Sequence, residues 1–141
     1  MDDMKMTMEN EDGFLSMADK LAAIIADEAE ALGDKVEKDW LNLVKANTPV
    51  DADGDEPGKL RAGWSSSHRK FGREGRLIEL ENPVEYTRPV EYGHRVVRNG
   101  EVVGYAKGRF FIKKSTRRIL KQLPKEYKAM GARIQRRLGN D

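Results

Sequence analysis

The sequence predicts an α+β protein with a long N-terminal helix, a mostly antiparallel sheet of about four strands and a C-terminal helical segment. Apolar residues recur every three or four positions before residue 47 and again after residue 110, which is the period of an amphipathic helix. Between them, residues 59–105 show alternation and turn signals that are typical of antiparallel strands. A chain of 141 residues fits one core, so we expect a single domain, residues 1–141.

The N-terminal helix is predicted over residues 14–47. It ends near Asn47 because Pro49 pushes the residue before it out of helical geometry. Gly33 would permit a bend within it. Residues 1–13 have no usable period, and we expect them to form a flexible arm. The apolar stripe of the helix comprises Phe14, Met17, Leu21, Ile25, Ala29, Leu32, Val36, Trp40 and Val44.

A first hairpin is predicted in the sheet region. Leu60, Ala62 and Trp64 alternate with polar or small residues, which indicates a strand with one buried face. Residues 65–75 contain serines, basic residues and glycines and are expected to be a turn region. Residues 76–82 then form the second strand, with Ile78 and Leu80 inward and Glu79 and Glu81 outward.

A second hairpin and a C-terminal helix follow. Asn99-Gly100 lies between two pairs of valines and predicts a type I′ turn, because both residues tolerate positive φ. Residues 86–93 are too short and mixed to assign by periodicity. Residues 110–138 are predicted to be helical, with Pro124 either starting a new helix or kinking this one. The face of the first part of this helix comprises Phe111, Ser115, Ile119 and Leu123.

Charge is divided along the chain although the net charge is only +2. Residues 1–58 carry 16 acidic and 5 basic side chains, whereas residues 106–141 carry 2 and 12. The acidic front could pair with the basic tail of a neighbouring copy, or the tail could meet an anionic partner. The simpler alternative is that the two regions pair within one subunit.

Composition excludes several classes of function. The chain has no cysteine, which removes disulfides, thiolate zinc sites and cysteine nucleophiles. No apolar run reaches the ~18 residues that a membrane span needs, and the acidic N-terminus is unlike a signal peptide. We therefore expect a soluble protein that is made in the cytoplasm and has no membrane partner.

The acidic loop DADGDEPG raises the question of a calcium site. Asp51, Asp53 and Asp55 have the spacing of the first ligands in an EF-hand loop. The sixth position is Glu56 where that loop needs glycine, and the twelfth is Ala62 where it needs a carboxylate. We expect a solvated turn and no metal site.

Other possible catalytic groups have no suitable partners in sequence. His68 and His94 are the only histidines, and one histidine cannot hold zinc. Residues 65–68, Ser-Ser-Ser-His, have no nucleophile elbow around them. Glu79 and Glu81 share a strand face but have no third acid, and no glycine-rich stretch forms a phosphate loop. We expect no enzyme activity and no cofactor.

The basic C-terminal region leaves nucleic-acid binding as an alternative function. Its net charge of +10 would suit phosphate contacts. Against this, the basic residues surround the predicted helix, and no aromatic surface accompanies them. Docking on an acidic protein surface is the favoured alternative.

The order of several motifs resembles the small tail-component family of tailed bacteriophages, which is thought to act in tail completion or head-to-tail joining. That family has a TPVDTG-like turn followed by LRxS, then a Tyr-Ala-x-x-Val-Glu-Tyr/Phe-Gly segment, then a Phe that starts the last helix. The resemblance covers residues from about 15 to about 123. The matching positions are Thr48, Pro49, Val50, Asp51, Gly58, Leu60, Arg61, Trp64, Tyr86, Val90, Glu91, Tyr92, Gly93 and Phe110 or Phe111.

The chain departs from the family pattern at two places. Residues 52–57, ADGDEP, stand where the pattern has about one residue, and Thr87-Arg88 replaces the usual small residue. These differences concern the contacts of the loop and leave the framework intact. The acidic loop is thus expected to be an expanded family turn.

The resemblance implies a virion structural protein at the head-to-tail junction or the tail end. It implies a homo-oligomeric ring that contacts neighbouring neck or tail proteins, and six copies would match the symmetry of the tail by analogy. DNA would pass through the lumen of such a ring without specific binding. A repeated head-to-tail contact suits a subunit of divided charge. The interface candidates are Asp51, Arg61, Trp64, Tyr86, Glu91, Tyr92, Arg117 and Arg118.

Overall fold

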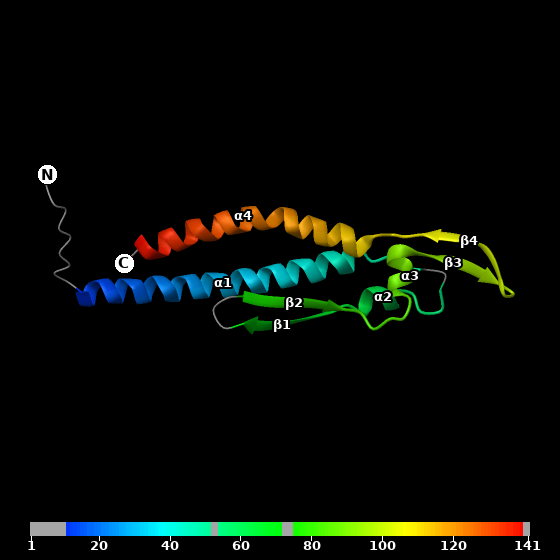
Figure 1. The fold of residues 1–141 in the computed structure, drawn as a ribbon, viewed down its shortest axis with the longest axis horizontal. Helices are drawn as coiled ribbons and strands as arrows, with labels where there is room; N and C mark the ends of the chain where they lie inside the picture. The colour runs from blue at the N-terminus through cyan, green and yellow to red at the C-terminus, as the bar shows by residue number, and fades with distance from the viewer. Residues whose placement is uncertain (1–10, 52–53, 72–74, 140–141) are drawn as a thin grey trace, which may run out of the picture. The chain divides into compact units, whose positions relative to one another are not determined.

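The computed structural model confirms the α+β class and describes residues 11–51, 54–71 and 75–139. Its four strands form two separate two-stranded antiparallel sheets instead of one sheet (Figure 1). The chain divides into two compact units, which we call the terminal unit (residues 1–32 and 125–141) and the central unit (residues 33–124). The elements are α1 (Glu11–Asn47), α2 (Lys59–Ala62), β1 (Ser65–Phe71), β2 (Gly75–Glu81), α3 (Thr87–Tyr92), β3 (Gly93–Arg98), β4 (Glu101–Lys107) and α4 (Phe111–Gly139).

Helix α1 begins three residues before the predicted position. Residues 1–10 of the predicted arm lie outside the described residues, and residues 11–13 belong to the helix. In the terminal unit, the buried positions of α1 are Ile24, Glu28 and Leu32, which are spaced four residues apart on one face. From the predicted stripe, Leu32 and Val44 are buried, whereas Phe14, Met17 and Ile25 are exposed.

The core of the central unit consists of Val44, Leu60, Trp64 and Phe111. Trp64 and Phe111 meet edge to face, with ring centroids 6.3 Å apart, which is a favoured aromatic geometry. The strand predicted at residues 60–64 is wrong, because residues 59–62 form helix α2. Leu60 and Trp64 are four residues apart, a spacing that places both on one face in either a helix or a strand. The apolar pattern alone therefore could not separate the two.

The first hairpin is confirmed, but its first strand lies later in the chain. Strand β1 occupies part of the region predicted to be a turn and pairs with β2, with His68 opposite Ile78 and Ser66 opposite Leu80. His68 Nδ1 lies 2.9 Å from Glu37 Oε2 on α1. Because polar side chains occupy the inner face of β1, its sequence lacks the apolar alternation of a half-buried strand.

Gly33 makes room for an arginine of the first hairpin. Arg76 Nη2 lies 2.6 Å from Asp34 Oδ1 and 3.0 Å from Glu37 Oε2. A Cβ atom at Gly33 would lie 2.6 Å from Arg76 Nη1, closer than side chains tolerate. A small residue at this position therefore lets the guanidinium cross the helix surface.

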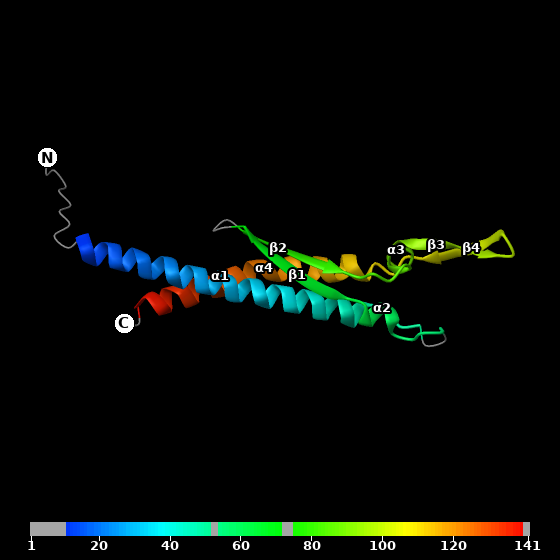
Figure 2. The ribbon, with the colours of Figure 1, turned by 90° about the horizontal axis from the view of Figure 1, so that it is seen from below.

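The second hairpin is confirmed at its predicted turn. Asn99 and Gly100 both have positive φ, 51° and 79°, as a type I′ turn requires. Pro124 lies inside α4, so it does not start a separate helix. Within the central unit, β1–β2 and β3–β4 extend in opposite directions from the segment that holds α2 and α3 (Figures 1 and 2).

Candidate protein interface

Glu91 joins α3 to the start of α4. Its side chain is only 2% exposed, and its two carboxylate oxygens accept hydrogen bonds from the backbone N–H groups of Ile112 and Lys113, each at 3.0 Å. These N–H groups belong to the first turn of α4 and have no partner within the helix. A carboxylate there also interacts favourably with the helix dipole. Glu91 therefore acts as a cap that comes from another helix.

Two glycines complete this junction at the base of the second hairpin. Gly93 has φ of 93°, and a Cβ atom there would lie 2.8 Å from the carbonyl oxygen of Ala106. A Cβ atom at Gly108 would lie 2.6 Å from the carbonyl oxygen of Glu91. The strands can approach α3 this closely only because both positions lack a side chain. The base of the hairpin is thus fixed by backbone packing.

A second junction ties the end of α1 to the core. Thr48 is fully buried, and its hydroxyl donates to the carbonyl of Val44 and accepts from Trp64 Nε1 at 2.9 Å. Arg61 Nη2 donates to the carbonyl of Thr48 at 2.8 Å. The guanidinium therefore satisfies a backbone carbonyl at the C-terminal end of α1, and the indole satisfies the buried hydroxyl of Thr48.

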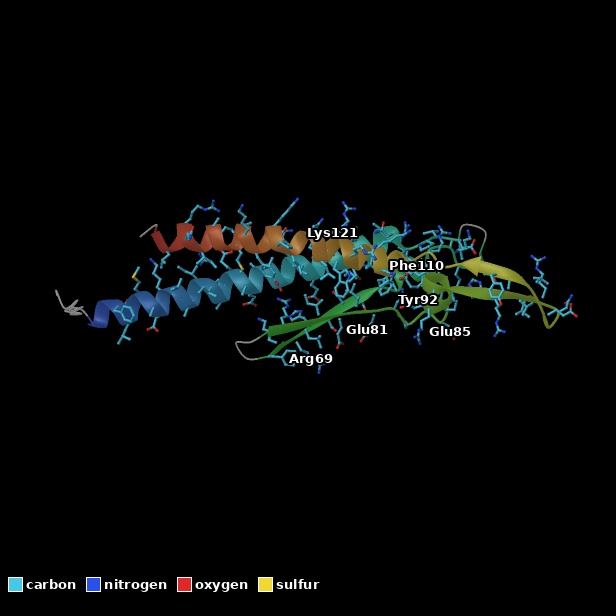
Figure 3. All side chains as sticks on the ribbon, turned by 45° about the horizontal axis from the view of Figure 1, so that its top comes forward. Arg69, Glu81, Glu85, Tyr92, Phe110 and Lys121 are labelled. Carbon is cyan, nitrogen blue, oxygen red and sulfur yellow. The ribbon has the colours of Figure 1, made fainter. Side chains whose placement is uncertain are left out.

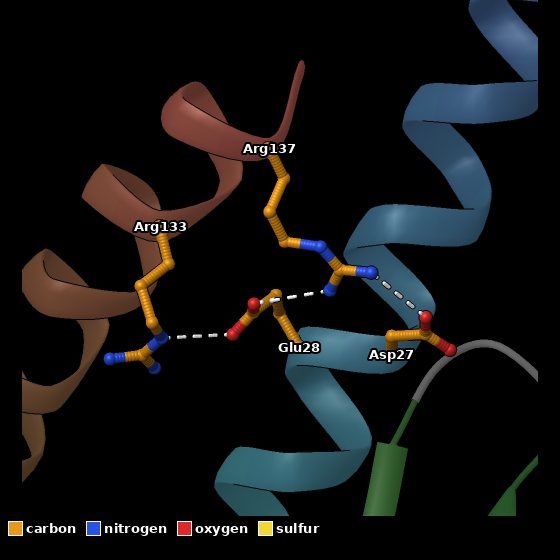
Figure 4. A network of polar contacts seen from close by, with 4 residues as sticks. All are labelled: Asp27, Glu28, Arg133 and Arg137. Carbon is orange, nitrogen blue, oxygen red and sulfur yellow. Dashed lines mark hydrogen bonds and ion pairs between the residues drawn. The ribbon is translucent and has the colours of Figure 1, made fainter. Parts of the chain in front are cut away.

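The terminal unit contains a network of ion pairs between α1 and α4 (Figure 4). Glu28 Oε2 lies 2.9 Å from Arg133 Nε, and Glu28 Oε1 lies 3.1 Å from Arg137 Nη1. Arg137 also reaches Asp27 at 3.1 Å. The hydrogen bond from Arg133 is the main reason why the pKa of Glu28 lies below its ordinary value of 4.5, since it and Arg137 together outweigh the effect of burial. Part of the divided charge is therefore paired within the chain.

The pKa of Glu37 is also lowered, in the central unit. Burial alone would raise the pKa of this carboxyl, but hydrogen bonds from Ser66 and Arg76 and the nearby His68 together outweigh it. Both Glu28 and Glu37 thus stabilise packing through their charged forms.

Five strongly exposed apolar side chains of the central unit lie on β3–β4 or beside it. Tyr105 is 77% exposed and Tyr92 66%, and Val97, Val102 and Val103 are each at least half exposed. An open hollow of 660 Å³ lies at the base of this hairpin. The residues that line it are Tyr92, Gly93, His94, Arg95, Tyr105, Ala106, Lys107 and Gly108.

Aromatic contacts support the exposed Tyr92 beside this hollow. Its ring meets that of Phe110 edge to face, with centroids 6.5 Å apart (Figure 3). Lys113 Nζ lies 5.7 Å from the centroid of Phe110, within the range of a cation–π interaction. Tyr92 is thus held in place although two thirds of its surface remains accessible. Aromatic residues in this setting are typical of protein interfaces.

The interface candidates fall into two groups. Trp64 and Glu91 are buried and make their contacts inside the central unit. The exposed candidates are Asp51, Arg61, Tyr86, Tyr92, Arg117 and Arg118. The role of all eight in an interface stays a prediction. The sequence interpretation did not include Val97, Val102, Val103 and Tyr105, although two valine pairs around a predicted turn carry an apolar signal on both sides of it.

The structure describes no group of three or more potential metal ligands in residues 11–51, 54–71 and 75–139. Asp53, the central acid of the EF-hand-like spacing, lies outside those residues. Among the helices in the described ranges, none is both long and apolar enough to cross a membrane.

Comparison with known protein families gives a match over more than half of the chain. The model described as "Bacteriophage HK97-gp10, putative tail-component" matches residues 7–93. No curated protein and no solved structure matches the chain. The matched segment contains the junction at the end of α1, from Thr48 to Trp64, and the α3 side of the junction with α4, from Tyr86 to Gly93. The chain therefore belongs to the HK97-gp10-like family of bacteriophage tail components.

Proposed function

We propose that the chain is the repeated subunit of a ring that completes the phage tail or joins it to the head. The observation that carries this proposal is the exposed apolar surface of β3–β4 in a member of a tail-component family. An isolated two-stranded hairpin is marginally stable in water. Exposed valines and tyrosines on such a hairpin gain free energy when a partner covers them.

Unpaired basic residues on α4 give further support. Arg117 and Arg118 are exposed, and in the part of the chain that the structure describes they form no ion pair. Arg133 and Arg137, by contrast, pair with Glu28. The basic region is therefore only partly neutralised by its own chain. The remaining charge is available for an acidic surface of a neighbouring copy.

The acids that the fold holds most firmly have structural roles, which suits a non-enzymatic protein. Glu91 caps α4, Glu28 binds two arginines and Glu37 binds Arg76. A catalytic carboxylate must instead face a substrate-sized space. We assign the function to surfaces and not to a reaction.

Mass photometry and negative-stain electron microscopy of the purified chain test this function. We expect closed rings of one size, and a reduced ring fraction for the double variant Arg117→Glu with Arg118→Glu. The control is Lys38→Glu with Lys128→Glu, which makes the same change in net charge at two other exposed positions. A chain that stays monomeric would contradict the proposal. Rings that form equally in both double variants would contradict the role of the basic surface on α4.

The nucleic-acid alternative is distinguished in the same samples. Binding of a short duplex DNA is followed by fluorescence anisotropy over a series of salt concentrations. Tight binding that weakens steeply with salt, in a chain that forms no rings, would favour the alternative function. Rings that are insensitive to nuclease favour a structural role.

A further inference from the structure

One face of hairpin β3–β4 combines apolar and basic side chains. Tyr105 lies opposite Arg95 in the strand register, and Val97 lies opposite Val102. Cross-strand partners share a face, and residues two apart on one strand do so as well. A register shift between Val96 and Val97 leaves Val103 as an extra residue on β4, so Val102 and Tyr105 lie on the same side although they are three residues apart. These four residues therefore form one surface, which we call the hairpin face (Arg95, Val97, Val102 and Tyr105).

The hairpin face is presented by a fixed base. Gly93 and Gly108 pack directly against backbone atoms, and Glu91 anchors the preceding helix to α4. The hairpin beyond this base is basic, since residues 93–109 contain Arg95, Arg98, Lys107 and Arg109 but only one acid, Glu101. A suitable partner surface is thus acidic and partly apolar.

The first hairpin of the same unit carries a surface of that kind. Residues 71, 77, 79 and 81 lie on the face of β1–β2 opposite to the one that bears Ser66 and His68. Phe71 and Leu77 are exposed there, and Glu81 is exposed at the other end. We call this the outer sheet face (Phe71, Leu77, Glu79 and Glu81).

The outer sheet face is also acidic and accessible. Figure 3 shows Glu81 and Glu85 on the side turned away from α4. Glu79 is partly neutralised by Arg69 at 3.5 Å, whereas Glu81 and Glu85 form no ion pair with any described residue. The surface therefore offers unpaired carboxylates next to apolar groups.

The two faces belong to hairpins that extend in opposite directions within the central unit (Figures 1 and 2). They cannot meet within one copy without a rearrangement of the core between them. Contact between two copies would therefore join two different surfaces, and the pair would keep one surface of each kind free. Such a heterologous contact repeats, and it closes into a ring when the rotation permits.

We propose that the hairpin face of one copy docks on the outer sheet face of the next copy. This proposal rests on the ring assembly proposed above and names the surfaces that build it. The valines and Tyr105 cover Leu77 and Phe71, and Arg95 lies near Glu81. The apolar contact supplies most of the free energy of association, whereas the charges fix register and exclude wrong partners.

Crosslinking in the cysteine-free chain tests the contact directly. The variant Val102→Cys with Leu77→Cys is treated with a short bismaleimide and analysed by denaturing electrophoresis. We expect a ladder of covalent oligomers, whereas each single-cysteine variant stops at a dimer at most. The control pairs Val102→Cys with Lys121→Cys, an exposed position on α4 away from both faces, and should give no ladder. The proposal is overturned if only the control pair gives a ladder. It is also overturned if the pair Val102→Cys with Leu77→Cys gives no ladder although rings form.

A charge exchange tests the same contact without a crosslinker. Arg95→Glu and Glu81→Arg should each reduce the ring fraction in mass photometry at least tenfold, and the double variant should restore most of it. Failure of the double variant to restore assembly overturns the pairing.

The wild-type control separates failure of this proposal from failure of the proposed function. Rings that persist in both single variants overturn the docking contact but leave ring assembly intact. A monomeric wild type overturns both. If Arg95→Glu instead loses binding to duplex DNA and its rings persist, the hairpin face is a nucleic-acid surface and the docking contact is wrong.

Discussion

The core of the central unit and the hairpin face use similar side chains in opposite ways. Trp64 and Phe111 are buried against each other, and the polar atom of the indole binds Thr48. Tyr105 and Val97 present comparable apolar surface to solvent. The difference separates residues that fold the subunit from exposed residues that the proposed assembly would cover.

The family match covers residues that fold the subunit and does not reach the hairpin face. The matched residues 7–93 end at Gly93, where the second hairpin begins. Within the match, Thr48, Arg61, Trp64 and Glu91 contact the ends of helices or the core. The motifs that identify the family are thus explained by the internal structure of the subunit. An assembly surface on β3–β4 would lie beyond them.

The largest effect on the free energy of unfolding is expected from a substitution in the core of the central unit. Trp64→Ala should reduce the free energy of unfolding by about 3–5 kcal/mol, because it leaves a cavity beside Phe111 and removes the partner of the buried Thr48 hydroxyl. Tyr105→Ala should change it by less than about 0.5 kcal/mol, because that ring is exposed. Urea unfolding followed by circular dichroism measures both under conditions where the chain is monomeric. Equal losses would contradict the separation of the two regions.

A smaller effect is expected at the cap of α4. Glu91→Ala leaves two partly buried N–H groups without their acceptor and should cost about 2–3 kcal/mol. The matched control is Glu85→Ala, an exposed acid six residues earlier, which should cost less than about 0.5 kcal/mol. The same urea titration measures the two variants. Hydrogen exchange should also show earlier exchange at the first turn of α4 in Glu91→Ala, and protection unchanged from wild type would show that Glu91 is not the cap.

The smallest effect is expected on the pH dependence of stability in the terminal unit. Because the pKa of Glu28 is lower in the folded chain than its ordinary value of 4.5, its contribution to stability is complete above that value and is lost as the pH falls through the folded pKa. Glu28→Gln should therefore make the free energy of unfolding less dependent on pH between about pH 5 and pH 3. Asp19→Asn, at an exposed position of the same helix, is the control. Thermal unfolding across this range measures the effect, and identical slopes for wild type and Glu28→Gln would show that the ion pairs do not stabilise the fold.

Much of the fold follows from local sequence signals. Long helical periods, the Asn99-Gly100 turn and the alternation around Ile78 and Leu80 each report on residues close in the chain, and the structure confirms them. The alternation of Leu60, Ala62 and Trp64 predicts a strand, but Ala62 is exposed, and Leu60 and Trp64 are four residues apart and so share a face in a helix as well. The sequence does not reveal strand β1, because its inner face carries His68, which pairs with Glu37 of α1. Such pairing depends on distant residues, so no local period reveals it.

The candidate site, too, could be predicted from the sequence only in part. The sequence motif drew attention to Glu91 and Trp64, but only the structure shows that both are buried and serve the fold. Burial of Glu28 could not be predicted either, since a charged residue becomes a core position only when arginines from a distant helix satisfy it. The valines of the second hairpin can be located from the sequence, because they flank the Asn99-Gly100 turn. Only the structure shows that they are exposed, since no element in the described part of the chain covers them.

Sedimentation velocity of the double variant Val102→Ser with Tyr105→Ala tests the central claim most directly, with thermal unfolding measured on the same sample. The account predicts a folded chain with the thermal midpoint of the wild-type monomer and a loss of the ring-sized species. A ring-sized species that persists in this variant would contradict the assignment of assembly to the hairpin face, and an unfolded variant would contradict the separation of folding from assembly.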